Sequence, residues 1–353
     1  MKITEIAQPG YEKVVRAEDP ASGLRALIAI HDTTLGPALG GLRMWPFRSW
    51  EEAQFDVLRL ARGMTFKSAI ADTGLGGGKS IILGNPKTDK TDALFHAMGS
   101  FIDSLGGTYI TAEDVGTSVE DMVKVKQRTR WVTGLPRSMG SSGDPSPWTA
   151  LGVFRGQKAC IEDIFGTSDF AGKTVAIQGM GNVGAMLAGH LSAAGAKLVV
   201  TDVTLDRARE AAHRHGALIV PPDAIYEVPC DIFAPCALGA VINDETIKRL
   251  QCKIIAGGAN NVLLREDHGD RLREMGILYA PDYVINAGGI INISCEVEPG
   301  GYDDSHSRKK VENIYNALKA VFRLSREQNL STNRASNLVA EEKLREGRAR
   351  RRT

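Results

Sequence analysis

The amino-acid sequence predicts an α/β protein whose two domains flank a cleft. Strand-like and helical patterns alternate after Thr174, and this rhythm favours βαβ units and a parallel sheet. Two glycine-rich segments, around Gly77 and Gly181, stand in separate parts of the chain. Between them, residues 140–147 are dense in glycine, serine and proline. Such a stretch cannot form a long regular element, so we expect the hinge between the domains there.

Length and composition agree with a two-domain protein that is soluble. The chain has 353 residues, of which 24% are charged and 43% hydrophobic. A formal net charge of +1 gives no reason to expect nucleic acid or a membrane as the main partner, and no apolar run approaches the roughly 18 residues of a membrane span. The start of the chain lacks the apolar region of a secretory signal. The five scattered cysteines fit thiols in a reducing compartment, so we expect a cytoplasmic protein.

The expected elements follow from the spacing of the apolar residues. Before the hinge, we expect strands at residues 24–30 and 81–83 and helices at 49–62 and 91–105. After it, we expect strands at 174–178, 197–201, 231–234, 253–256 and 277–280, with helices at 182–194 and 207–215. Two amphipathic helices, near 308–328 and 333–345, close the chain. The arginines after residue 347 are expected to form a frayed, solvated end.

The second glycine-rich segment, Gly179-Met180-Gly181-Asn182-Val183-Gly184, lies between an expected strand and an expected helix. In that setting glycines permit a tight turn and close approach of the backbone to a pyrophosphate, whose charge meets the helix N-terminus. Asp202 follows the next strand, where a carboxylate accepts hydrogen bonds from ribose hydroxyls and repels a 2′-phosphate. The segment therefore predicts a dinucleotide site with NAD, rather than NADP, as cofactor. Arg207 nearby weakens that preference slightly.

The first glycine-rich segment ends in Lys79, which is either part of a simple turn before a strand or a lysine available for chemistry. A phosphate-binding P-loop fails on spacing, because Thr73 stands where that motif needs a glycine. Lys67, at the end of a helical pattern, is either a surface lysine or a second functional cation. Asp114 follows a strand-like run and would either face a cleft or lie in a surface turn. Together these residues predict acid–base chemistry on an anionic substrate.

Two asparagines, Asn260 and Asn261, also follow an expected strand. They would serve either as turn residues or as amides that hold a nicotinamide and a carboxylate. The histidines do not cluster, since His213 and His215 diverge on a helix and no HExxH motif is present. We therefore expect no metal site.

Taken together, these segments resemble the amino-acid dehydrogenases that include the glutamate, leucine, valine and phenylalanine enzymes. The resemblance covers residues 28–344, and within the family it is strongest to the members that act on leucine. The segments that carry it are Gly36-Pro37-Ala38-Leu39-Gly40-Gly41-Leu42-Arg43, Gly76-Gly77-Gly78-Lys79, Thr111-Ala112-Glu113-Asp114-Val115-Gly116, Ala234-Pro235-Cys236-Ala237-Leu238-Gly239 and Asn286-Ala287-Gly288-Gly289.

The resemblance implies a fold and an activity. Residues 1–140 would form a substrate-binding α/β domain with a mixed sheet, joined by a C-terminal helix at about 330–353. Residues 147–329 would form a Rossmann-type dinucleotide-binding domain. The activity implied is reversible oxidative deamination of an L-amino acid to a 2-oxo acid and ammonium, with reduction of NAD, in a homo-oligomer. Because the chain lacks the longer tail of many relatives, its subunit number stays open.

The resemblance also implies roles for residues. Lys67 would pair with the substrate α-carboxylate, assisted by Asn261. Lys79 would have a depressed pKa and act as the base that activates water. Asp114 would carry protons to and from the amine. The residues implied in cofactor binding are Thr149, Gly179, Gly181, Asn182, Val183, Gly184, Asp202, Cys236, Ala237, Asn260 and Asn286.

Substrate choice can be considered at Leu39, Ala112, Ile290 and Ile293, the positions that the family uses for the substrate side chain. Glutamate enzymes carry a lysine at the position of Leu39, and phenylalanine enzymes tend towards glycine at Leu39 and Ala112. An apolar slot of medium size favours branched aliphatic amino acids: leucine, and also isoleucine and valine, because one methylene changes discrimination by only about 1–3 kcal/mol. Further substrate contacts are implied for Gly40, Gly41 and Met64.

Two alternatives remain open from the sequence. One is a dehydrogenase of the same family that acts on aromatic amino acids, phenylalanine or tryptophan. The other is a protein that binds a dinucleotide without catalysis. The presence of Lys67, Lys79 and Asp114 together speaks against the second alternative.

Overall fold

The structure, a computed structural model, describes residues 1–351 and divides into two compact units. Unit 1 contains Met1–Asp144, Ile293–Asp304 and the chain from Ala340 onward; unit 2 contains Pro145–Asn292 and Ser305–Val339. The units differ from the predicted domain ranges in two respects. The segment Ile293–Asp304 belongs to unit 1, and the residues just before Ala340 belong to unit 2. The boundary after Asp144 falls inside the predicted hinge.

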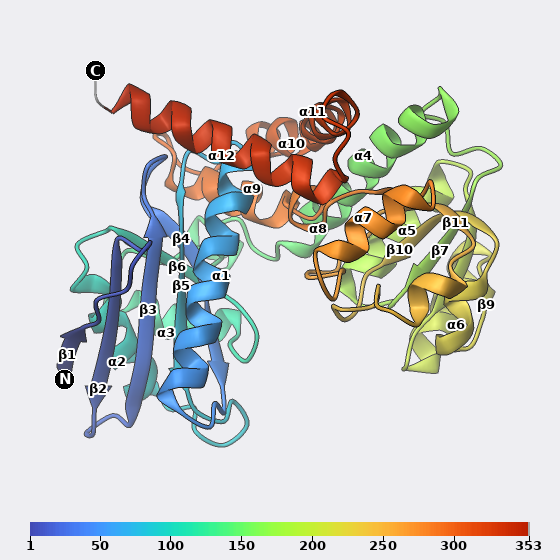
Figure 1. The fold of residues 1–353 in the computed structure, drawn as a ribbon. Coiled ribbons are helices and arrows are strands. Elements are labelled where there is room, and N and C mark those ends of the chain that lie inside the picture. The colour runs from blue at the N-terminus through green and yellow to red at the C-terminus, as the bar shows by residue number, and fades with distance from the viewer. Residues whose placement is uncertain (352–353) are drawn as a thin grey trace. The chain divides into compact units, whose positions relative to one another are not determined.

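Unit 1 is built on a six-stranded sheet with the order β1-β2-β3-β5-β4-β6. The first three strands and β5 are joined by antiparallel pairs, whereas β4 runs parallel to both β5 and β6, so the expected mixed sheet is confirmed. Helix α1 covers one face of this sheet, and α2 and α3 cover the other (Figure 1). The bounds are β1 Lys2–Glu5, β2 Lys13–Asp19, β3 Leu24–Asp32, β4 Ala38–Trp45, α1 Trp50–Ile70, β5 Gly76–Leu83, α2 Asp92–Asp103, β6 Tyr109–Glu113 and α3 Val119–Lys126.

Helix α1 begins where its sequence indicates. The hydroxyl of Ser49 accepts a hydrogen bond from the Glu52 N–H, and the acidic first turn complements the helix dipole. Its buried face is made of small residues, including Ala53, Val57 and Ala61, which pack against strand residues such as Ile81. Small side chains on this face let the helix lie close to the sheet.

The three glycines before Lys79 lie inside strand β5, so the interpretation of this segment as a turn is wrong. Gly77 is the contact point with α1, because a Cβ atom there would lie 2.0 Å from the Thr65 backbone nitrogen. On the other face, a Cβ atom on Gly78 would lie 2.9 Å from the ring of Tyr109. The glycines therefore serve close packing on both faces of the strand.

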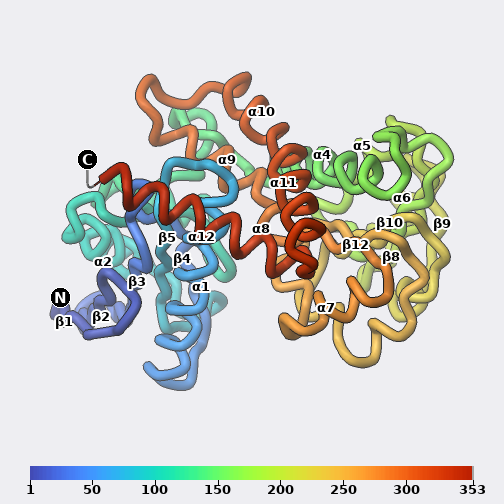
Figure 2. The backbone as a smooth tube through the Cα atoms, turned by 45° about the horizontal axis from the view of Figure 1, so that its top comes forward, coloured from blue at the N-terminus to red at the C-terminus, as the bar shows by residue number. Residues whose placement is uncertain are grey.

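Unit 2 contains a sheet of six parallel strands with the order β12-β11-β10-β7-β8-β9, which confirms the expected Rossmann-type domain. From β7 the chain winds outward to β8 and β9, and from β10 it winds the other way to β11 and β12. The switch between these directions lies between β7 and β10, the point at which such sheets bind ligands. Helices α4 and α5 pack side by side on one side of the sheet, and α7 lies on the other (Figure 2).

The remaining bounds complete the chain. They are α4 Ser146–Phe165, β7 Thr174–Gln178, α5 Asn182–Ala193, β8 Lys197–Thr201, α6 Leu205–His215, β9 Leu218–Ile219, β10 Cys230–Pro235, β11 Cys252–Ile255, α7 Asp267–Glu274, β12 Leu278–Tyr279, α8 Asp282–Ile285, α9 Gly288–Ser294, α10 Asp304–Glu312, α11 Ile314–Glu327 and α12 Thr332–Arg350. Short 3₁₀ turns occupy Arg137–Met139, Pro222–Glu227, Thr246–Arg249 and Cys295–Val297.

Three of the differences from the sequence-based expectation concern the helices α4, α10 with α11, and α12. Helix α4 was not expected, although a proline in its first turn suits a helix start. The helix expected at 308–328 is two helices, α10 and α11. The arginine-rich end is not frayed at Arg348, because helix α12 continues through this residue. The guanidinium of Arg348 lies 2.7 Å from the Asp32 carboxylate.

The cysteines and the helices allow two further observations. All five cysteines are free thiols, and Cys160 and Cys295 are buried. Among the described residues, no helix has the length and apolar character that crossing a membrane requires.

The contact between α1 and β5 generates a stability prediction. Gly77→Ala should lower the free energy of unfolding by about 3 kcal/mol, because the added methyl group meets the backbone of α1. Gly63→Ala is the matched control on α1, since a Cβ atom there meets nothing within 4 Å. We expect that change to stabilise the protein by about 0.5–1 kcal/mol. Urea unfolding of both variants checks this, and equal stabilities would contradict the packing argument.

Candidate active site

The sheet of unit 1 brings five of the predicted substrate and catalytic residues onto the face covered by α1: Leu39, Gly41, Lys79, Ala112 and Asp114. Side chains alternate between the two faces of a strand, and Gly77 faces α1, so Lys79 faces it as well. Leu39 pairs with Gly77, and Gly41 pairs with Ala112 on β6, which places these positions on the same face. Three neighbouring parallel strands therefore supply one cluster.

At the centre of this cluster is an ion pair between Lys79 and Asp114. The Nζ atom of Lys79 lies 2.9 Å from Oδ2 of Asp114, and Lys79 is only 5% exposed. Gly41 leaves the space for this pair, because a Cβ atom there would lie 2.7 Å from the Asp114 Cβ and 3.2 Å from the lysine Nζ. The surface-turn interpretation of Asp114 is therefore wrong: its carboxylate points to the sheet face.

The surroundings shift both pKa values. Burial lowers the pKa of Lys79 below its usual value, although the paired carboxylate of Asp114 acts in the opposite direction. Burial alone would raise the pKa of Asp114, but the adjacent cations Lys79 and Arg43 outweigh it and lower that pKa. The structure thus contains a lysine that loses its proton more readily than usual beside an ionised carboxylate.

The loop after β6 is fixed by Thr117. The backbone N–H of Asp114 donates to the Thr117 hydroxyl oxygen at 3.0 Å, and that hydroxyl lies 2.8 Å from the Leu42 carbonyl of β4. The position of Asp114 is therefore fixed by a hydrogen bond of its backbone N–H and by the ion pairs of its carboxylate.

The other predicted residues of unit 1 lie on α1, on the sheet and in the segment that begins at Ile293. Met64 and Lys67 are three residues apart on α1, and both are half-buried. A Cβ atom on Gly40 would lie 1.8 Å from the Gly78 carbonyl oxygen, so this glycine permits the close approach of β4 to β5. Ile293 reaches the neighbourhood of Gly134. Leu39 and Ala112 are 2% and 6% exposed, with no charge of their own.

Two predicted substrate residues, Asn261 and Ile290, belong to unit 2. Asn261 has a φ of 51°, a left-handed conformation that asparagine tolerates better than most residues. Ile290 is 8% exposed on α9.

The glycine-rich turn of unit 2 has the geometry that a pyrophosphate site needs. Gly179 has a φ of 96°, and a Cβ atom there would lie 2.7 Å from the Cβ of Ala237 at the end of β10. A Cβ atom on Gly184 would lie 2.0 Å from the Gly179 carbonyl oxygen. By contrast, a Cβ atom on Gly181 would meet nothing within 4 Å, so the backbone is open just before the α5 N-terminus at Asn182. These residues fit a dinucleotide.

Asp202 and Cys236 flank the same turn. The carboxylate of Asp202 follows β8 and accepts 2.7 Å hydrogen bonds from the N–H groups of Met180 and Thr204. Cys236 accepts a hydrogen bond at its Sγ atom from the Gly258 N–H, and burial raises the pKa of this thiol to about 11. The thiol is therefore neutral. Val183 packs towards Gly258.

The remaining predicted cofactor residues make contacts in two separate sets. The amide of Asn286 donates to Oδ1 of Asn260 at 2.7 Å and to the Ala259 carbonyl at 3.2 Å. The hydroxyl of Thr149 donates to the Pro145 carbonyl at 3.1 Å, and a Cβ atom on Gly289 would lie 2.9 Å from that hydroxyl. These contacts place the side chains firmly within unit 2.

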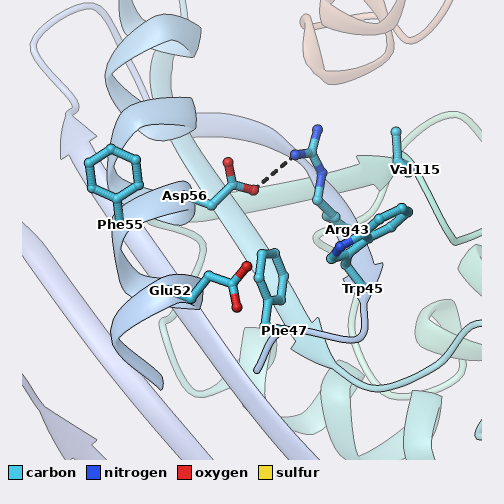
Figure 3. A pocket seen from close by; sticks show the side chains of 7 residues that line it. All are labelled: Arg43, Trp45, Phe47, Glu52, Phe55, Asp56 and Val115. Carbon is cyan, nitrogen blue, oxygen red and sulfur yellow. Dashed lines mark hydrogen bonds and ion pairs between the residues drawn. The ribbon is translucent and has the colours of Figure 1, made fainter. Parts of the chain in front are cut away.

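Sequence reasoning missed one charged residue beside the central ion pair. Arg43 of β4 contacts Asp114 and also Asp56 of α1. Arg43 ends one of the segments that carry the family resemblance, but no role was assigned to it from the sequence. Its position two residues after Gly41 was the available signal, because alternation puts both on the α1 face. Arg43 and Asp56 line a hollow of about 390 Å³ with Trp45, Phe47, Glu52, Phe55 and Val115 (Figure 3).

Comparison with known proteins places this chain in a family. Residues 11–131 match the model described as Glu/Leu/Phe/Val dehydrogenase, dimerisation domain. Residues 140–206 and 202–352 match the model Glutamate/Leucine/Phenylalanine/Valine dehydrogenase.

Individual relatives agree. A leucine dehydrogenase of Thermoactinomyces intermedius is 54% identical over 98% of this chain and 94% of its own length. A phenylalanine dehydrogenase of Bacillus thermotolerans is 46% identical over 95% of this chain and 88% of its own length. The crystal structure of the L-tryptophan dehydrogenase from Nostoc punctiforme superposes with a TM-score of 0.86 at 44% identity, over 96% of this chain and 97% of the other. The chain belongs to the glutamate, leucine, phenylalanine and valine dehydrogenase family.

Proposed function

We propose that this chain catalyses the reversible oxidative deamination of a branched-chain L-amino acid, L-leucine above all, to its 2-oxo acid and ammonium. The observation that carries the proposal is the buried pair of Lys79 and Asp114 on the same sheet face as the neutral side chains Leu39 and Ala112. The similarity to leucine dehydrogenases supports the choice of substrate.

The cofactor of the proposed reaction is NAD. Bound at the glycine turn of unit 2, its nicotinamide would accept the hydride that leaves the amino-acid Cα. Gly179, Gly181, Asn182, Val183 and Gly184 would hold the pyrophosphate at the α5 N-terminus, and Asp202 the adenosine ribose. Thr149, Asn260 and Asn286 would hold the nicotinamide end, with Cys236 and Ala237 beside the turn.

The protein's own groups would bind the substrate and move protons. Lys67 would pair with the α-carboxylate, assisted by the amide of Asn261, which fixes the Cα position. The neutral amine of Lys79 would take a proton from water as that water attacks the oxidised carbon. Asp114 would carry protons to and from the departing amine, and its contact with Lys79 would allow the proton to be shared. The lowered pKa of Lys79 supports its use as a base near neutral pH.

Leu39 and Ala112 would limit the substrate side chain from unit 1, together with Met64, Gly40, Gly41 and Ile293. Ile290 would contribute from unit 2. A second carboxylate, as in glutamate, would be buried beside Leu39 without a cation, which costs several kcal/mol. Aromatic amino acids are the second candidate, because phenylalanine and tryptophan dehydrogenases are also similar to this chain.

We also propose that the protein assembles as a homo-oligomer. The family model that matches residues 11–131 is described as a dimerisation domain, and this supports the proposal.

The substrate proposal predicts the outcome of a panel of L-amino acids. NADH formation at 340 nm should be fastest with leucine, isoleucine or valine, and slow with glutamate, phenylalanine and tryptophan. Leu39→Lys should lower leucine turnover because it buries an ammonium, whereas Leu39→Gly combined with Ala112→Gly should shift preference towards phenylalanine. Faster turnover of an aromatic amino acid by the unaltered enzyme would support the second candidate instead.

The acid–base proposal predicts distinct effects of three substitutions. Lys79→Ala and Asp114→Asn should each lower kcat by a factor of about 10² to 10⁴, because each removes a proton-transfer group. Lys67→Ala should in addition raise KM for the amino acid, since it removes a carboxylate partner. Steady-state kinetics and NAD binding measure these effects. A nearly normal kcat in Lys79→Ala would exclude the proposed mechanism.

The cofactor proposal predicts a preference for NAD over NADP of at least about tenfold in kcat/KM, because Asp202 would repel a 2′-phosphate. Asp202→Asn should reduce that preference. Asp206→Asn is the matched control, since Asp206 is an exposed carboxylate in the first turn of the following helix α6 and pairs with Arg209. Equal use of the two cofactors by the unaltered enzyme would contradict the assignment.

A further inference from the structure

Arg43 joins two carboxylates that come from different elements. Its Nε atom donates to Oδ2 of Asp114 at 3.0 Å, and its Nη1 atom donates to Oδ2 of Asp56 at 2.9 Å. The other oxygen of Asp56 lies 3.2 Å from Arg59. Figure 3 shows Arg43 from the sheet and Asp56 from α1 pointing towards each other at the edge of the hollow. The side chains of Arg43 and Asp56 are 21% and 16% exposed, so this bridge is largely shielded from water.

The same oxygen of Asp114 serves both cations. Lys79 contacts Oδ2 at 2.9 Å and Arg43 contacts it at 3.0 Å. The two positive groups therefore lie within about 6 Å of each other, a distance at which like charges still repel strongly inside a protein. An arginine cannot lose its proton here, whereas a lysine can. The carboxylate of Asp114 offsets part of this repulsion, and loss of the proton from Lys79 removes it.

We propose that Arg43, anchored by Asp56, is a positioning residue for the reaction: it fixes the carboxylate of Asp114 and, as a permanent neighbouring cation, favours the neutral amine of Lys79. This inference rests on the proposed function, in which Lys79 is the base. A guanidinium suits the task because its rigid fork donates to two carboxylates at once, which the single ammonium of a lysine does less well.

The other ionisable groups around Lys79 do not reproduce this effect. Burial lowers the pKa of Lys79, Asp114 and Asp56 raise it, and Arg43 lowers it further. On β6, Tyr109 is neutral because burial raises its pKa, and Glu113 alternates to the opposite face of the strand. Two further ionisable residues belong to elements packed on this side of the sheet: Lys67 on α1, and His31 on β3, whose Nδ1 atom lies 2.9 Å from the Thr65 hydroxyl. Arg43 is the cation that contacts the same Asp114 oxygen as Lys79.

The test is the pH dependence of leucine oxidation in four proteins: unaltered, Arg43→Gln, Arg43→Lys and Arg59→Gln. For Arg43→Gln, the rising limb of kcat/KM against pH should move up by about one pH unit, and kcat should fall at least about tenfold, with KM for NAD unchanged. In Arg43→Lys, the rising limb of kcat/KM should lie close to its pH in the unaltered protein, because the positive charge is kept. The kcat of this variant should still be several-fold below that of the unaltered protein. Arg59→Gln, which removes a charge that contacts Asp56 but not Asp114, should leave both unchanged.

A second measurement separates this inference from the proposed function. Acetylation of the Lys79 amine by acetic anhydride, followed across pH by peptide mass spectrometry, reports its protonation without turnover. Labelling in Arg43→Gln should need a higher pH than in the unaltered protein. If the unaltered protein oxidises no amino acid, the proposed function fails while this measurement still decides the effect of Arg43.

Three outcomes would overturn the inference. One is an unchanged labelling profile and pH profile in Arg43→Gln, and another is the same shift in Arg59→Gln. Should Arg43→Gln fail to fold, Arg43→Lys decides alone, because a normal kcat in that variant would mean that the guanidinium fork is not required.

Discussion

A buried ammonium is the constraint around which unit 1 is organised. Lys79 stands in the middle of a strand whose every residue is buried, and an isolated charge in that position would be strongly destabilising. The carboxylate of Asp114 compensates it at 2.9 Å, and Arg43 contacts the same carboxylate oxygen at 3.0 Å. A chain of alternating charges results, from Lys79 through Asp114 and Arg43 to Asp56 near the surface. Each member depends on the next for its partner.

Room for this chain of charges comes from residues without side chains. Gly41 leaves the space for the ion pair, and Gly77 lets α1 approach the strand that carries Lys79. Larger residues at these positions would move the helix or the strands by an ångström or more, and the ion pair would lose its geometry. The ion pair therefore depends on the close packing that the glycines permit, so the site requires these glycines as well as its charged residues.

The sequence predicted the parts of the structure that depend on local pattern. The parallel sheet of unit 2 and the turn at Gly179 follow from alternation and glycine spacing, and both are present. The segment at Gly77 was not predicted as a strand because glycine normally weakens a strand, and the close packing of α1 and of Tyr109 on its two faces explains the glycines. Helix α4 was missed because its first residues resemble a linker. Alternation along β4 could place Arg43 on the α1 face, but its ion pairs could not be predicted, since its two partners are distant in sequence.

The way in which the two units share the chain has a consequence for biosynthesis. Unit 1 takes residues from both ends of the sequence, and its last segment begins at Ala340, after all of unit 2 has been made. That segment supplies Arg348, whose guanidinium binds Asp32 at the end of β3. During translation the strands of unit 1 are therefore made first, but a segment that contacts them is made only after every residue of unit 2. Unit 1 cannot form all of its native contacts from its N-terminal residues alone.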